Sequence, residues 1–109
     1  MEHALGNIFI RPGELGSPGT SVEGHKHNFD HVTYCVRGRL RIDAALPNGE
    51  RVSREIGAAD PHPYVLIRAG IEHRLTSLEE GTAYHCIYAH RTAQGDVVQD
   101  YTGWPAAYR

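Results

Sequence analysis

The chain has 109 residues, of which 40% are hydrophobic and 22% are charged, and these values are typical of one globular domain. With a formal net charge of −2, no basic field points to nucleic acid or an anionic membrane, and the longest apolar runs are too short to cross a bilayer. Because the first residues do not resemble a signal peptide and Cys35 and Cys86 lie in apolar runs, we expect a cytoplasmic protein with reduced, buried thiols.

Short β-rich runs recur about every eight to twelve residues and are separated by Gly, Pro or Asn. Helical periodicity is nearly absent, so the pattern is typical of an all-β sandwich or barrel. We expect a single domain over residues 1–109, with the barrel over 7–90 and a tail over 91–109. The expected strands are residues 7–11, 20–27, 31–37, 39–46, 50–56, 64–68, 73–77 and 82–90.

Pro-Gly and Asn-Gly pairs lie between or beside these runs, and such pairs predict turns. Pro12-Gly13 and Pro18-Gly19 are the first two, and Asn48-Gly49 predicts a hairpin between residues 39–46 and 50–56. In the first hairpin strand, one face is expected to be apolar and the other polar, because Leu40, Ile42 and Ala44 alternate with Arg39, Arg41 and Asp43. We expect the second strand to continue the polar face through Arg51, Ser53 and Glu55, as a solvated or ion-pairing surface rather than a binding patch.

The run Tyr64-Val65-Leu66-Ile67 is apolar on both faces, which predicts a strand buried between layers or against a second subunit. The tail contains Tyr101, Trp104 and Tyr108. These aromatic residues indicate docking on the barrel or on a partner chain, with a disordered tail as the alternative.

Three histidines fall within seven residues, in the pattern His25-x-His27-x-x-x-His31. In an extended chain His25 and His27 project to the same side, about 7 Å apart. Two such imidazoles can reach one metal ion through bonds of about 2 Å, and His31 can return on the next strand as a third ligand. The spacing therefore predicts a metal site.

These residues resemble a motif of the cupins, the superfamily of small double-stranded β-helix (jelly-roll) proteins. The first cupin motif, G-x5-H-x-H-x3,4-E-x6-G, is matched in every spacing from Gly19 to Gly38, with His31 in place of the glutamate. The second motif, G-x5-P-x-G-x2-H-x3-N, is half kept. Gly70 and His73 are in register, whereas the other three positions hold His62, Arg68 and Ser77.

The resemblance implies a cupin jelly-roll barrel in which His25, His27, His31 and His73 bind one metal ion, as in the four-histidine subgroup. Imidazole ligands suit Fe, Mn, Ni, Cu or Zn, so the ligand set does not identify the metal. Four neutral ligands would leave a divalent ion its full charge and thereby favour anionic or enolisable oxygen ligands. Two coordination positions would stay open for a substrate.

The last expected strand offers a further candidate, because its two faces carry different chemistry. The resemblance favours an inward face containing His85, which could then act as a general acid or base, or could simply be a core histidine. If the other face points inward, Tyr84 and Cys86 line the pocket instead. Cys35 shares its strand face with His31 and could border the cavity.

Three functions are compatible with this site. The favoured one is a metalloenzyme that oxidises, or oxidatively cleaves, a small oxygenated or enolisable substrate by a dioxygenase-like route. The second is a non-redox lyase or isomerase with the metal as a Lewis acid, and the third is a non-catalytic binding module. We expect a small-molecule substrate and, since small cupins are commonly dimers, a homodimer.

Overall fold

The structure is a computed structural model that describes residues 3–25, 27, 29–89 and 93–95, except for the side chains of residues 3–4 and 23–25. These residues form nine strands and no helix, which confirms the all-β prediction. The strands are β1 (His3–Leu5), β2 (Ile8–Gly16), β3 (Ser21–His25), β4 (His31–Arg37), β5 (Arg39–Ala45), β6 (Arg51–Gly57), β7 (Tyr64–Ile67), β8 (Glu72–Ser77) and β9 (Thr82–Ala89). The described residues accordingly contain no helix that could span a membrane.

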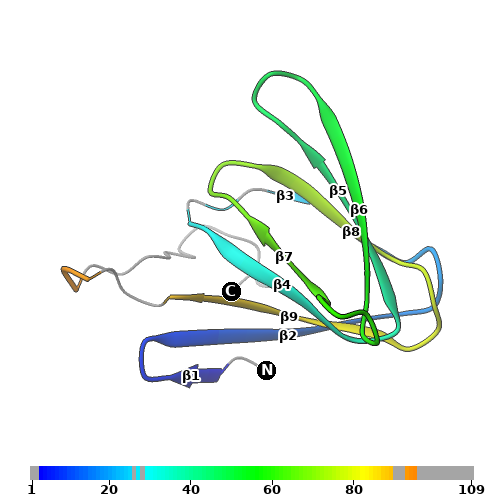
Figure 1. The fold of residues 1–109 in the computed structure, drawn as a ribbon, viewed down its shortest axis with the longest axis horizontal. Coiled ribbons are helices and arrows are strands. Elements are labelled where there is room, and N and C mark those ends of the chain that lie inside the picture. The colour runs from blue at the N-terminus through cyan, green and yellow to red at the C-terminus, as the bar shows by residue number, and fades with distance from the viewer. Residues whose placement is uncertain (1–2, 26, 28, 90–92, 96–109) are drawn as a thin grey trace.

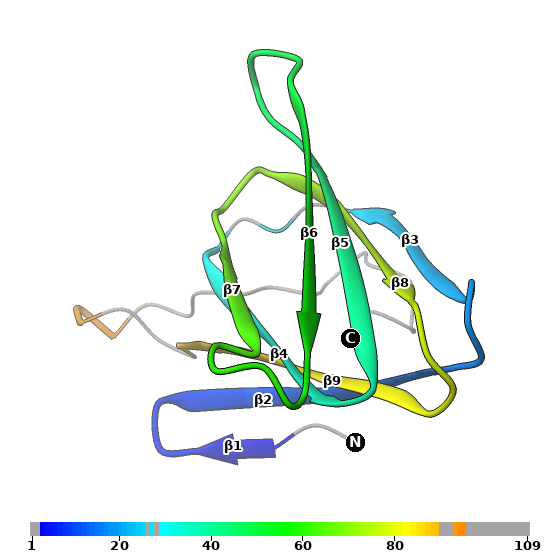
Figure 2. The ribbon, with the colours of Figure 1, turned by 45° about the vertical axis from the view of Figure 1, so that its right-hand side comes forward.

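The strands form two antiparallel sheets that face each other (Figure 1). One sheet has five strands in the order β1-β2-β9-β4-β7, and the other has four in the order β3-β8-β5-β6. Figure 2 shows the same two layers from a second direction, with the β5–β6 hairpin projecting beyond the rest of the four-stranded sheet. Most neighbouring strands are far apart in sequence, as the crossovers of a jelly roll require.

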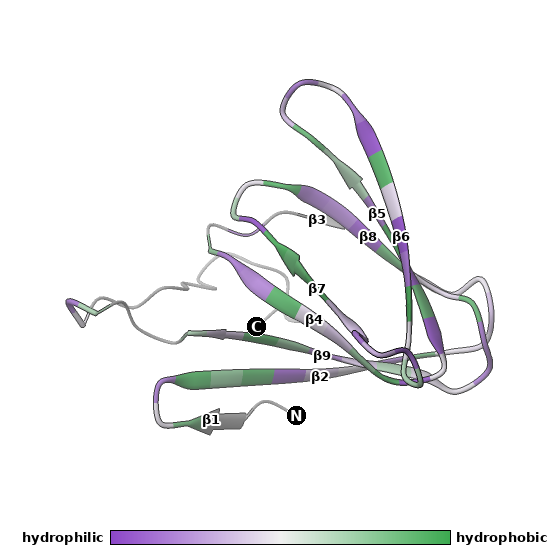
Figure 3. Cartoon of the chain, in the orientation of Figure 1, coloured by the Kyte–Doolittle hydropathy of each residue, from purple (hydrophilic) through white to green (hydrophobic). Residues whose placement is uncertain are grey.

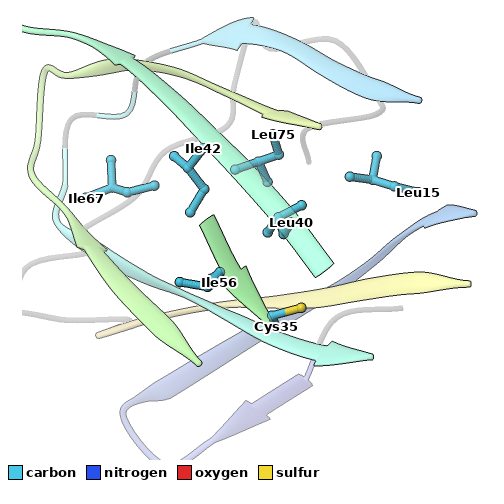
Figure 4. Close-up of a cluster of buried hydrophobic side chains, with 7 residues drawn as sticks. All are labelled: Leu15, Cys35, Leu40, Ile42, Ile56, Ile67 and Leu75. Carbon is cyan, nitrogen blue, oxygen red and sulfur yellow. The ribbon is translucent and has the colours of Figure 1, made fainter. Parts of the chain in front are cut away.

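Strand alternation places the core between the sheets. The core cluster draws on both layers and comprises Leu15, Cys35, Leu40, Ile42, Ile56, Ile67 and Leu75 (Figure 4). The predicted apolar face of residues 39–44 is confirmed, because Leu40 and Ile42 are buried. Cys35 belongs to this core, and burial raises the pKa of its thiol.

The predicted hairpin joins β5 and β6. Gly49 has a positive φ of 88°, and the amide of Glu50 donates to Oδ1 of Asn48 over 2.9 Å, so each residue of the Asn-Gly pair has a role in the turn. The polar face of the hairpin is ion-paired, with 3.0 Å between Arg39 and Glu55 and 3.1 Å between Arg41 and Asp43.

The pKa of Asp43 reflects this pairing. Partial burial opposes its ionisation, but hydrogen bonds from Ser53 and Arg41 and the nearby charge of Arg74 lower its pKa below the ordinary value. The expectation of an ion-pairing surface here is met.

Two turns were predicted in the first twenty residues, and one of them is wrong. Pro18-Gly19 forms a turn in which Gly19 has a φ of 89°. Pro12-Gly13, in contrast, lies within the continuous strand β2, paired with His85 and Tyr84 of β9. A Cβ atom at Gly13 would overlap the ring of Tyr84, so this glycine makes room for an aromatic side chain on the neighbouring strand.

The run of residues 64–67 is not buried between layers, which corrects one of its two predicted roles. It forms β7, an edge strand on which Ile67 faces the core and Leu66 is 50% exposed. Figure 3 shows the hydrophobic character of β7 and of much of β2. The predicted tail over residues 91–109 lies outside the described residues, apart from 93–95.

Candidate metal centre

Three of the four predicted metal ligands converge between the two sheets. His27 follows β3, His31 begins β4, and His73 lies at the start of β8, and all three are at most 9% exposed. Their candidate ligand nitrogens all lie within 4.8 Å of one another. The ring centroids are 4.8 Å apart for His27 and His31 and 5.1 Å apart for His31 and His73.

A β-bulge in β3 gives the His-x-His pair its direction. Val22 lies opposite Leu75 of β8, but the register then shifts by one residue, so that His25 lies opposite His73. If the same residues alternated strictly from the inward Val22, with no bulge, position 27 would face the outer side of the sheet. The bulge therefore permits His27 to be buried beside His73.

The loop that carries His27 is hydrogen-bonded to the loop that precedes β8 and His73. The amide of Gly70 donates to the carbonyl oxygen of His27 over 2.8 Å, and the amide of Ala69 donates to Oδ1 of Asp30 over 2.7 Å. Gly70 has a φ of 80°, a left-handed conformation that favours glycine and explains this position of the second motif. Asp30 is not a position of either sequence motif, although a carboxylate in a turn between two ligand positions is a recognisable signal.

The ring of His73 is oriented by the backbone. Its Nδ1 lies 3.0 Å from the carbonyl oxygen of Ile71, and since a carbonyl only accepts, Nδ1 must carry the proton. This tautomer leaves Nε2 with a lone pair for a metal. A backbone carbonyl behind a histidine is a common way of fixing a metal ligand.

Three aromatic rings, those of Phe29, Tyr88 and Phe9, pack in succession beside His27. Phe29 is 4% exposed, and its ring centroid lies 4.7 Å from that of His27 and 4.6 Å from that of Tyr88. Tyr88 in turn stacks on Phe9 of β2 at 5.0 Å. These rings exclude water from one side of the histidines.

The three imidazoles fit a transition metal ion. Two bonds of about 2.1 Å to one ion place their ligand atoms at most about 4.2 Å apart, so binding requires adjustments of only about half an ångström. Among the described side chains the cluster contains no carboxylate, and the neighbouring Asp30 is half exposed and is engaged with Ala69 and, at 3.8 Å, with Arg68. The three clustered ligands are therefore neutral, and on their own they would leave a divalent ion its full charge.

The fourth predicted ligand, His25, is placed only in part. Its backbone lies opposite His73 in the β3–β8 register, whereas its side chain lies outside the described residues.

His85 is not part of the cluster, and the expectation that its face points inward is wrong. It pairs with Pro12 and with Tyr34, which is 37% exposed, on the outer face of the five-stranded sheet. The next residue, Cys86, pairs with the fully buried Thr33 and therefore faces inward. The alternative prediction, an inward face that contains Tyr84 and Cys86, is the one that the register supports.

The Cys86 thiol faces the interior in its protonated form. Burial raises its pKa to about 11, against the weaker opposing effects of Thr33 and the charge of Arg11. At neutral pH this thiol is protonated, so it contributes a small, weakly polar surface to the interior rather than a nucleophile.

The two facing antiparallel sheets are those of a cupin jelly roll. Comparison with solved structures bears this out. A deletion mutant of Bacillus subtilis oxalate decarboxylase aligns with a TM-score of 0.67 over 76% of this chain and 21% of its own, with 23% identity. A structure from work on the Mn(II) centres of the same decarboxylase gives 0.67 over 94% of this chain and 27% of its own, with 20% identity.

An oxalate oxidase structure is also similar, with a TM-score of 0.62 and 16% identity over 74% of this chain and 40% of its own. This chain thus spans less than half of the length of each of these proteins. No protein-family model and no curated protein matches the sequence. The comparisons therefore show the fold, and the resemblance to cupins is confirmed at that level.

Proposed function

We propose that this protein is a metal-dependent cupin enzyme that oxidises, or oxidatively cleaves, a small oxygenated or enolisable substrate. The observation that carries the proposal is the convergence of His27, His31 and His73, from both sheets, into a buried cluster with ligand atoms within 4.8 Å of one another. His25 completes the ligand set in this proposal, because its backbone lies opposite His73.

Each part of the chain then has a defined task. The histidines hold one divalent transition metal, the Ile71 carbonyl and the Asp30 turn orient them, and Phe29 excludes water on one side. When bound, such an ion polarises substrate oxygen atoms and, if it is redox-active, supports oxidation. The wholly neutral ligand set favours a substrate that binds through an anionic oxygen.

Metal analysis of protein purified without a metal-affinity step tests the metal site. We expect one equivalent of a transition metal, and an affinity at least tenfold lower in His27→Ala, His31→Ala and His73→Ala. His62→Ala is the matched control, because this histidine is exposed and precedes β7, whereas the loop next to the cluster follows that strand. Equal metal binding by all four variants would refute the proposal.

Oxygen dependence tests the reaction. We expect oxygen uptake when the Fe(II), Mn(II) or Cu(II) forms are supplied with diketones or related enolisable substrates.

A non-redox lyase or isomerase is the second candidate, since the similar structures include a decarboxylase as well as an oxidase. Turnover under nitrogen, also with Zn or Ni, would establish that candidate. Absence of turnover together with a metal that has no exchangeable water would instead indicate a binding module.

We further propose a homodimer that forms through the outer face of the five-stranded sheet. Two of its cross-strand rows are largely apolar: one contains Ile10, Ile87, Val32 and Leu66, and the other contains Pro12, His85, Tyr34 and Tyr64. Five strands about 4.8 Å apart and roughly 20 Å long cover several hundred Å², the order of area that each partner of a stable dimer buries.

A cytoplasmic location is also part of the proposal, because both cysteines are free thiols.

A further inference from the structure

The inner face of the four-stranded sheet carries an arginine that no ion pair explains. Arg54 of β6 pairs with Ile42 of β5, whose side chain is 4% exposed in the core. Directly opposite residues share a face of the sheet, so Arg54 lies on the face that also carries His73.

Strand β6 leaves the core as it approaches its hairpin, and this opens the interior to solvent. On the inner face Ile56 is 2% exposed, whereas Val52 is 43% exposed and Arg54 is exposed as well. Figures 1 and 2 show the same divergence, because the β5–β6 hairpin extends away from the five-stranded sheet. An exposed valine on an inward face marks the mouth of the space between the sheets.

The cross-strand rows relate this mouth to the metal centre. His73, Ala44 and Val52 lie in one row across β8, β5 and β6, and Arg54 lies on the next inward row. With strands about 4.8 Å apart and about 3.3 Å per residue, the Cα atoms of His73 and Arg54 are roughly 12 Å apart. The small Ala44 between them leaves room for a ligand.

Three other arginines of this sheet have carboxylate neighbours on the outer face, whereas Arg51 lies exposed on that face, away from the space between the sheets. Arg39 and Arg41 form ion pairs, and Arg74 contributes to the low pKa of Asp43. Arg11 lies on the inner face of the opposite sheet, where it pairs with Cys86 of β9, and it is already engaged in an interaction with another residue. Among the described residues Arg54 has no hydrogen bond or ion pair, and it faces the space beside a neutral ligand set.

We infer that Arg54 selects the substrate, by binding a carboxylate of a small acid whose other oxygen group binds the metal. This inference rests on the proposed function and narrows it to substrates with a carboxylate and a second oxygen function. A guanidinium suits the carboxylate end because it offers paired N–H donors that remain charged at any working pH.

The test compares two arginines on the two faces of one strand. Arg51 is also exposed on β6, but it is paired with Ala45 on the outer face, so Arg51→Gln removes the same charge from the wrong side. Both variants and the parent protein are loaded with Co(II), and succinate, acetate and imidazole are titrated while the visible spectrum of the cobalt is followed. Succinate can reach both the metal and Arg54, whereas acetate and neutral imidazole can reach only the metal.

We expect Arg54→Gln to bind succinate about tenfold more weakly and to lose the preference for succinate over acetate, with imidazole binding unchanged. Arg51→Gln should behave like the parent protein. Equal effects of the two variants, or no effect of Arg54→Gln, would overturn the role of Arg54 while the metal centre stands. A parent protein that takes up no cobalt would instead refute the proposed function, and this inference with it.

Discussion

His31 determines the charge of the proposed centre, because it stands where the first cupin motif has a glutamate. It is 2% exposed, and its ring lies 5.1 Å from that of His73. A carboxylate at this position would cancel part of the charge of a divalent ion and would weaken its attraction for anions.

We therefore expect His31→Glu to keep the metal but to bind acetate about tenfold more weakly than the parent protein, as measured by titration of the Co(II) form. Imidazole, a neutral ligand, should bind equally to both and serves as the control. Unchanged acetate affinity would show that the charge of the ligand set does not govern anion binding.

Asp30 is a second important residue, and its role is to hold two loops of the proposed centre in place. Its carboxylate accepts the 2.7 Å hydrogen bond from the amide of Ala69 and so joins the loop between β3 and β4 to the loop between β7 and β8. We expect Asp30→Ala to lower the free energy of unfolding by about 1 kcal/mol and to weaken metal binding severalfold, because the histidine loops lose this link.

Arg68→Ala is the matched control for Asp30, since it removes only the exposed 3.8 Å ion pair and leaves the Ala69 hydrogen bond in place. Such exposed pairs contribute little, so neither urea unfolding nor metal titration should change measurably. A variant of Arg68 as impaired as that of Asp30 would assign the link to charge rather than to the hydrogen bond.

At the scale of elements, the bulge in β3 is the feature on which the His-x-His pair depends. Insertion of one alanine after Gly24 would shift the alternation by one residue and turn position 27 toward the outer face. We expect this variant to fold but to lose metal binding by at least a hundredfold, as measured by titration and metal analysis. Deletion of Gly24 removes the extra residue and keeps position 27 on the inner face, so this variant should still bind one equivalent; retention of the metal after the insertion would contradict the dependence on register.

The contact between β2 and β9 depends on a glycine. We expect Gly13→Ala to lower the free energy of unfolding by about 1–3 kcal/mol, because the new methyl group overlaps the ring of Tyr84. In a Tyr84→Ala background the same substitution should cost almost nothing, and a double-mutant cycle of the four urea unfolding curves measures this coupling. Additive effects would show that Tyr84 does not need the space.

Strand positions were largely predictable, because alternation and turn chemistry are local signals. The predicted ranges 31–37, 39–46 and 73–77 agree closely with β4, β5 and β8, and Asn48-Gly49 forms its hairpin. Pro12-Gly13 failed because a proline and a glycine can also occur in a strand whose neighbour fills the space.

The site was predictable as a set of ligands but not as an arrangement. Motif spacing singled out His27, His31 and His73, which the structure brings together. The inward face of β9 could not be derived from sequence, because both faces of residues 82–89 are equally apolar and only pairing with β4 distinguishes them. Arg54 was missed for the same reason, since its direction depends on its register with Ile42.

On the scale of the whole molecule, the proposed dimer predicts a change in oligomeric state. Leu66 is 50% exposed in an apolar row of the outer face. We expect Leu66→Glu to raise the dimer dissociation constant at least tenfold, because a charge is then buried against an apolar surface. Light scattering over a range of concentrations measures this change.

Val52→Glu is the control for Leu66→Glu, because Val52 is similarly exposed, at 43%, but on the other sheet. It should leave the oligomeric state unchanged. A parent protein that is monomeric at all concentrations would refute the dimer.

The position of β9 also has a consequence for biosynthesis. This strand, residues 82–89, lies between β2 and β4 in the five-stranded sheet, although it follows both in the chain. A nascent chain therefore cannot assemble that sheet until residue 89 has left the ribosome, and β2 and β4 wait with unpaired edges until then. The five-stranded sheet therefore forms only after residue 89 has emerged, so stalling before residue 82 should yield chains that chaperones bind and proteases degrade.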